Sequence, residues 1–66
     1  MTSFGNRLRE LRKEKGKLQK DIAALLGVTE RHYREYEAGR VDAPLSNVML
    51  LADYFNVSID YLVGRC

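Results

Sequence analysis

Apolar residues recur along the chain at helical spacing, in five segments that each end at a glycine or an asparagine. In the first segment, Phe4, Leu8 and Leu11 lie at positions i, i+4 and i+7 and would share one helix face. No window alternates apolar and polar residues for long enough to suggest a strand. The closing residues are of types that tolerate a left-handed helix cap, and they are Gly16, Gly27, Gly39, Asn56 and Gly64. The pattern predicts one all-α domain over residues 1–66, a compact bundle with helices at about 4–15, 19–26, 30–38, 45–55 and 59–63.

The starts and inner faces of these helices follow from the same pattern. Thr29 offers an N-cap oxygen to the segment at 30–38, whereas Leu18 offers none to the segment at 19–26. Tyr33 and Tyr36 fall on one inner face, so we expect them in the core and not as platforms for stacked bases. In the segment at 19–26, the residues expected to face inward are Ile22, Ala23, Leu25 and Leu26.

Length and composition exclude several classes of protein. No apolar run, such as the one at 48–52, exceeds five residues, which is far shorter than the roughly 20 residues of a membrane span. No basic segment followed by an apolar stretch opens the chain, so we expect no secretory signal and a cytoplasmic location. One cysteine, Cys66, allows no internal disulfide, and with His32 it provides too few ligands for a metal site. We therefore expect no cofactor and no metal.

Charge is unevenly distributed, although the net charge is only +2. Residues 7–21 hold seven basic side chains against three acidic ones, and the balance reverses from Val41 onward. A basic first half is able to orient a chain on a polyanion, although a solvated helix face explains the same charges equally well.

The two segments at 19–26 and 30–38 form a helix, a tight glycine turn and a second helix, which is the helix-turn-helix pattern. A helix with exposed polar side chains fits the major groove of DNA, where each base pair shows its own donors and acceptors. The same pattern also occurs in helical bundles that bind no nucleic acid.

Specific motifs strengthen the first interpretation. From Leu8 to Gly64 the chain resembles the Cro/CI-type (XRE) helix-turn-helix family of phage and bacterial repressors. The motifs that carry the resemblance are RLRELR at 7–12, QKDIA at 19–23, LGVT at 26–29, Tyr33, YEAGR at 36–40, LA at 51–52 and NVSIDYL at 56–62. The resemblance implies a five-helix bundle of the lambda-repressor-like type that binds double-stranded DNA.

The resemblance also implies roles for individual residues. Base edges would be contacted by the exposed side chains of the second helix of the motif, which are Glu30, Arg31, Arg34 and Glu35. Phosphates would be contacted by residues that flank that helix, which are Gln19, Lys20, Thr29 and Arg40. Arg12 and Glu37 would form an internal ion pair with a structural role. The family usually has Ser or Thr where this chain has Leu18, so the chain departs from the family pattern at the start of the segment at 19–26, which carries Gln19.

The acidic outer face of the segment at 30–38 is unusual for the family. Between Glu30 and Arg40 three glutamates balance three arginines, so we expect this helix to supply selectivity. The basic first half of the chain would then supply much of the attraction to DNA.

A single helix-turn-helix contacts only a few base pairs, and members of the family pair two copies on a two-fold symmetric operator. We expect a homodimer, with its interface at Leu50, Ile59, Tyr61 and Val63. The sequence leaves open whether the chain is a whole regulator or the N-terminal part of a longer one.

The leading hypothesis is a transcriptional regulator, most simply a repressor. The alternative is a protein-interaction module, such as an antitoxin or an adaptor. The acidic outer face of the segment at 30–38 is compatible with this alternative. An enzyme is disfavoured because the sequence shows no paired carboxylates, no nucleophile beside a base and no phosphate-binding loop.

Overall fold

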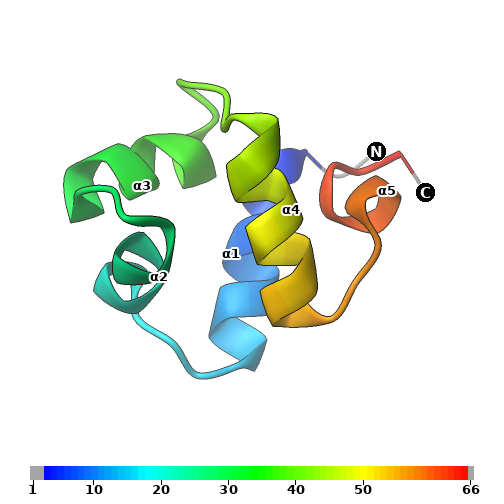
Figure 1. Ribbon diagram of the computed structural model, residues 1–66, viewed down its shortest axis with the longest axis horizontal. Helices are drawn as coiled ribbons and strands as arrows, with labels where there is room; N and C mark the ends of the chain where they lie inside the picture. Colours follow the sequence, from blue (N-terminus) through cyan, green and yellow to red (C-terminus); the bar gives the residue numbers. More distant parts are fainter. Residues whose placement is uncertain (1–2, 66) are drawn as a thin grey trace.

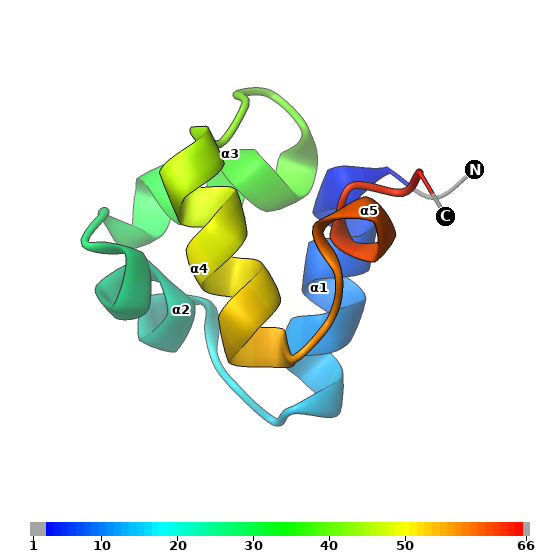
Figure 2. The same ribbon diagram turned by 45° about the vertical axis from the view of Figure 1, so that its right-hand side comes forward.

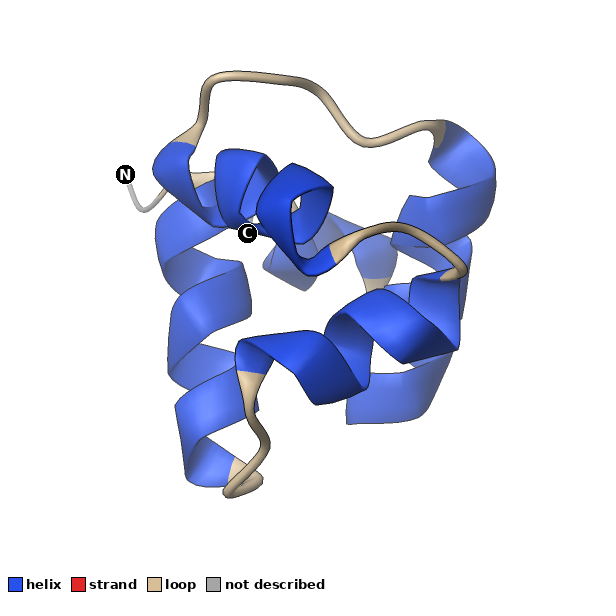
Figure 3. Ribbon diagram, turned by 90° about the vertical axis from the view of Figure 1, so that its left-hand side faces the viewer, coloured by secondary structure: helices blue, strands red, loops and turns tan. Residues whose placement is uncertain are grey.

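The computed structural model describes residues 3–65, and within this range every regular element is a helix (Figure 3). Cys66 lies outside the described residues. The five elements are α1 (Phe4–Glu14), α2 (Gln19–Leu26), α3 (Glu30–Ala38), α4 (Leu45–Phe55) and α5 (Ile59–Leu62). The bounds of α2, α3 and α4 match the expected ones, while α1 and α5 each end one residue earlier, with Lys15 and Val63 as C-caps.

Local sequence explains where the helices begin and end. Hydroxyl oxygens of Ser3, Thr29 and Ser58 accept a backbone N–H in the first turns of α1, α3 and α5. All five residues expected to adopt a left-handed conformation have positive φ, from 57° at Asn56 to 81° at Gly64. The prediction from the helix punctuation is therefore confirmed at each of these positions.

The helix α2 begins without an oxygen cap, as the sequence indicated, but it has a substitute. The side chain of Leu18 caps nothing, whereas Asp21 Oδ2 accepts the backbone N–H of Leu18 at 2.9 Å. This is one half of a capping box, and it places a negative charge in the first turn, where the helix dipole favours it.

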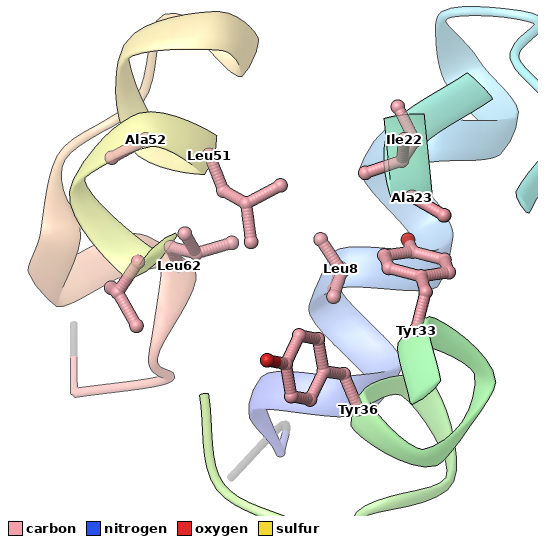
Figure 4. Close-up of a cluster of buried hydrophobic side chains, with 9 residues drawn as sticks. Leu8, Ile22, Ala23, Tyr33, Tyr36, Leu51, Ala52 and Leu62 are labelled. Atoms are coloured by element: carbon pink, nitrogen blue, oxygen red, sulfur yellow. The ribbon is translucent and has the colours of Figure 1, made fainter. Parts of the chain in front are cut away.

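All five helices contribute side chains to one core (Figure 4). Its largest fully buried residues are Leu8, Ile22, Tyr33, Tyr36, Leu51 and Leu62. Tyr33 and Tyr36 are thus core residues, as predicted. The expectation for Leu25 was wrong: its side chain is exposed, because Ile22, Ala23 and Leu26 form the face of α2 that turns toward the core.

The helices α2 and α3 lie together at one side of the molecule and α5 lies at the other, with α1 and α4 across the middle (Figure 1). The start of α1 packs very closely on the end of α3. A Cβ atom at Gly5 would lie 2.8 Å from the carbonyl oxygen of Tyr36 and closer still to that of Glu37. Only glycine permits this approach, which fixes α3 against α1.

Candidate nucleic-acid interface

The turn between α2 and α3 is built from Gly27, Val28 and Thr29 (Figure 2). Gly27 has a φ of 72°, and the N–H of Val28 donates back to the carbonyl oxygen of Ala23 at 3.0 Å. Thr29 then caps α3 by accepting the N–H of His32. Buried Ala23 allows close packing of α2 on its neighbours, whereas Ala24 is exposed. The two helices therefore have the helix-turn-helix arrangement expected from the sequence.

The inner face of α3 carries a buried polar cluster centred on Glu37. Arg12 of α1 donates to this carboxylate twice, from Nε to Oε2 at 2.7 Å and from Nη2 to Oε1 at 3.3 Å. Tyr33 Oη donates to Oε2 at 2.5 Å, and Gln19 Nε2 donates to Oε1 at 3.1 Å. One carboxylate thus joins α1, α2 and α3. We call these four residues (Arg12, Gln19, Tyr33 and Glu37) the buried cluster.

The pKa values in the buried cluster follow from these contacts. Burial alone raises the pKa of Glu37, but the hydrogen bonds from Arg12, Tyr33 and Gln19 together outweigh it and hold the pKa below its usual value. Burial, reinforced by the negative Glu37, raises the pKa of the Tyr33 hydroxyl. The hydrogen bond to Glu37 raises the pKa of Arg12 despite the cost of burial. Glu37 is therefore a carboxylate at neutral pH.

The outer face of α3 carries exposed ion pairs. Arg34 Nη2 lies 2.6 Å from Glu30 Oε2, and Arg40 Nε lies 2.5 Å from Glu35 Oε2. Within residues 3–65, Arg31 is exposed and forms no ion pair or side-chain hydrogen bond. All four side chains that we expected at base edges lie on α3, and two of them are already paired with each other.

The exposed charge of α3 differs from the sequence-based count. That count set three glutamates against Arg31, Arg34 and Arg40. Glu37 does not belong in it, because this residue is buried and its charge is matched by Arg12. The outer face therefore has two glutamates against three arginines and is positive, not neutral.

Three of the four residues expected at phosphates line two open hollows, and Arg40 lines neither. Gln19, Lys20 and Glu30 line a hollow of about 540 Å³ beside the start of α2. Thr29, Arg31 and Glu35 line a second one of about 280 Å³, in which His32 and Val41 also take part. We assigned no role in binding to His32 or Val41 from the sequence. The one signal for His32 was its spacing of three residues from both Thr29 and Glu35, which is typical of neighbours on one helix face.

The side-chain amide of Gln19 is less available than the resemblance implied. Its nitrogen donates to Glu37, and its oxygen accepts from Arg34 Nε at 3.1 Å. Gln19 therefore connects the buried cluster to an arginine on the outer face of α3. Lys20, by contrast, is exposed and has no ion pair within residues 3–65.

Several cations of the basic first half point away from this interface. The Arg7 guanidinium lies 4.0 Å from the centre of the Tyr61 ring on α5. Lys15 Nζ lies over the Tyr54 ring of α4 and donates to the carbonyl oxygen of that residue at 3.0 Å. With Arg12 buried as well, the attraction expected from this half falls to four exposed cations. Lys17 and Lys20 lie near the start of α2, and Arg9 and Lys13 lie on α1.

The four residues expected at a dimer interface divide into two pairs. Leu50 and Ile59 are 44% and 38% exposed. Tyr61 is half-buried under Arg7, and Val63 is half-buried against the core. Two further large apolar residues of α4, Leu45 and Met49, are more exposed than any of these, and sequence analysis missed them.

Residues 3–65 form helices of 4 to 11 residues. No helix in this range is both long and apolar enough to cross a membrane. No group of three or more His, Cys, Asp or Glu side chains in the same range is arranged to hold a metal ion.

Solved structures share this architecture. A transcriptional regulator from Listeria innocua is 38% identical and superposes with a TM-score of 0.92, covering 97% of this chain and 60% of that one. The restriction-modification controller protein C.AhdI from Aeromonas hydrophila is 36% identical, with a TM-score of 0.78 over 89% of each chain. The P22 c2 repressor in complex with a synthetic operator has the same fold, with a TM-score of 0.89 over the whole of both chains at 23% identity.

Curated relatives carry the same domain. The prophage-derived HTH-type transcriptional regulator YonR of Bacillus subtilis is 37% identical over 60 residues, which is 91% of this chain and 56% of YonR. AnsR, an HTH-type transcriptional regulator of the same organism, is 40% identical over 60 residues, covering 91% of this chain and 52% of AnsR. The chain thus spans about half the length of these relatives.

The family model described as helix-turn-helix (HTH_3) matches residues 8–62, which include all of α2 to α5 and most of α1. The chain therefore belongs to the helix-turn-helix family, of the Cro/CI (XRE) type that its motifs indicated.

Proposed function

We propose that residues 1–66 form a single DNA-binding domain of a sequence-specific transcriptional regulator, most simply a repressor. The observation that carries the proposal is the division of α3 into two faces. Its inner face is held by the core and by the buried cluster, while its outer face presents Arg31, Arg34 and two glutamates to solvent. A rigid helix with an exposed polar face is what major-groove recognition requires.

In the proposed complex α3 lies in the major groove. Arg31 pairs with the O6 and N7 atoms of guanine, and Arg34 does so when it leaves Glu30. Glu30 and Glu35 accept a hydrogen bond from the N4 amino group of cytosine. Gln19, Lys20, Thr29 and Arg40 contact phosphates, with the hollow beside the start of α2 as the place for one phosphate group. No catalytic step is part of this function, and a regulator of this kind acts where the chromosome lies, in the cytoplasm.

We propose further that two copies bind a two-fold symmetric operator. Exposed Leu50 and Ile59, together with Leu45 and Met49, make the side of the molecule that α4 and α5 form partly apolar. Pairing through this side leaves both copies of α3 free to enter successive major grooves about one helical turn apart.

The proposal is tested by selecting DNA fragments from a random pool on the purified chain at two salt concentrations. We expect a symmetric motif whose affinity falls steeply as salt is raised, since bound phosphates release counterions. Recovery of fragments no better than random at both salt concentrations contradicts the proposal.

A protein-interaction module, such as an antitoxin or an adaptor, is the second candidate. The exposed apolar residues of α4, of which Leu45 is 66% and Met49 50% exposed, favour a protein partner. The two candidates separate in the same selection, because a module that only holds another protein enriches no DNA motif.

A further inference from the structure

Two of the three arginines on or just beyond the outer surface of α3 are held by carboxylates of that helix. Arg34 pairs with Glu30 four residues earlier, and Arg40 pairs with Glu35 five residues earlier. A second, longer contact of 3.5 Å joins Arg40 Nη2 to the other oxygen of Glu35. Between these pairs, Arg31 has no carboxylate partner within residues 3–65. The arginines of one surface therefore differ in how available they are.

Both ion pairs are open to solvent. The side chains of Arg34 and Glu30 are 55% and 42% exposed, and those of Arg40 and Glu35 are 68% and 30% exposed. The hydrogen bond from Arg40 holds the pKa of Glu35 below its usual value, so this carboxylate keeps its charge at neutral pH. Exposed ion pairs contribute little to stability, and a good base contact is therefore able to replace them.

A phosphate is a poor competitor for these arginines. It offers a guanidinium the same kind of charged oxygen that the carboxylate already supplies. If a phosphate takes the arginine, the displaced glutamate remains beside the arginine and repels the phosphate. Because phosphates are the same at every position of a duplex, this penalty applies to DNA of any sequence.

Base edges do not carry the same penalty. Guanine O6 and N7 accept from an arginine, while cytosine N4 donates to a glutamate. Only a DNA site that offers an acceptor to the arginine and a cytosine N4 to the glutamate satisfies both members of an opened ion pair.

We propose that Glu30 and Glu35 determine specificity by holding Arg34 and Arg40 away from phosphates until a cytosine takes each glutamate. Arg34 then pairs with guanine, and Arg40 makes its phosphate contact. This inference rests on the proposed function, because it concerns how the same surface selects among DNA sequences. It changes the role of the two glutamates from base contacts alone to control of the neighbouring arginines.

The experiment compares Glu30→Gln and Glu35→Gln with the unchanged chain on two duplexes, the selected motif and a random sequence, over a range of salt. A released arginine adds one phosphate contact, which steepens the salt dependence on the random duplex by about 0.9 and raises affinity about eightfold at 0.1 M salt. Affinity for the selected motif rises less or falls, so discrimination between the two duplexes decreases.

Two controls isolate the ion pairs. Glu10→Gln on α1 makes the same change of charge at an exposed residue that has no ion pair within residues 3–65, and we expect no change in salt dependence. Glu35→Gln is also made in an Arg40→Gln background, where no arginine remains to be released and the rise in affinity disappears.

The inference is overturned if the glutamine variants bind the random duplex with unchanged salt dependence, or if Glu10→Gln raises it equally. Either result leaves the proposed function intact when the unchanged chain still selects a motif. Absence of any selected motif removes the proposed function instead, and the random duplex still shows whether the arginines are released.

Discussion

The two faces of α3 use the same pair of residue types for different purposes. On the inner face Arg12 and Glu37 have side chains that are 11% and 4% exposed. Two further donors form hydrogen bonds to the Glu37 carboxylate. On the outer face the arginine and glutamate side chains are 30% to 68% exposed. Removing one partner of a buried pair leaves an uncompensated charge, whereas opening an exposed pair costs little. Burial therefore decides which pairs hold the fold and which are available for exchange with a ligand.

The largest effect that tests this contrast is expected from Glu37→Gln. The change leaves Arg12 charged and buried, and breaking a buried pair in this way costs about 3–5 kcal/mol of unfolding free energy. The exposed control, Glu35→Gln, should lower the unfolding free energy much less, because water and salt screen an exposed ion pair. Urea denaturation of both variants measures the difference, and equal losses show that burial does not separate the two faces.

Lowering the pH is a second test of the contrast between the buried and the exposed ion pairs. The folded state holds the pKa of Glu37 below the value of about 4.3 expected in the unfolded chain, so its contribution to stability is complete above that value. The contribution is lost as pH falls through the lower pKa of the folded state. We therefore expect the stability gap between the unchanged chain and Glu37→Gln to be full at pH 7 and to shrink below about pH 4. A gap that stays constant in urea denaturation at both pH values rules out this assignment.

Gly5→Ala tests how tightly the inner face is fixed. The added methyl group meets the carbonyl oxygens of Tyr36 and Glu37, which are backbone atoms that cannot rotate away. Overpacking of this kind costs about 1–3 kcal/mol, more than alanine gains from its better helix propensity. Thermal unfolding measures the loss, and Lys13→Ala, at an exposed position of the same helix, should stay within about 0.5 kcal/mol. An unchanged midpoint for Gly5→Ala means that α1 and α3 separate easily.

The outer face is tested by Arg31→Ala and Lys20→Ala. Arg31 has no carboxylate to displace, so its loss should change which base is preferred and reduce discrimination by about 1–3 kcal/mol. Lys20→Ala should weaken all sequences alike and reduce the salt dependence by about one. Affinities for the selected motif and its single-base variants distinguish the two outcomes. A uniform loss in both variants contradicts the division into base and phosphate contacts.

The sequence by itself determined the order of the helices, most of their ends and the side of α3 that enters the core. These features are local: a cap needs an oxygen or a left-handed residue at one position, and the phase of Tyr33 and Tyr36 follows from 3.6 residues per turn. Local pattern failed at Leu25, because both Leu25 and Leu26 are apolar and only the packing of α2 decides which one is covered.

The tertiary structure alone decided how the charges are paired. Glu37 and Arg12 are 25 residues apart, and it was the family resemblance, not their spacing, that indicated their contact. The structure removed Glu37 from the exposed charge of α3, turned Arg7 and Lys15 toward α5 and α4, and placed Gln19 between Glu37 and Arg34. The physical reason is that long charged side chains reach several partners, and only the packing of the helices determines which partner is near and which pair is shielded from water.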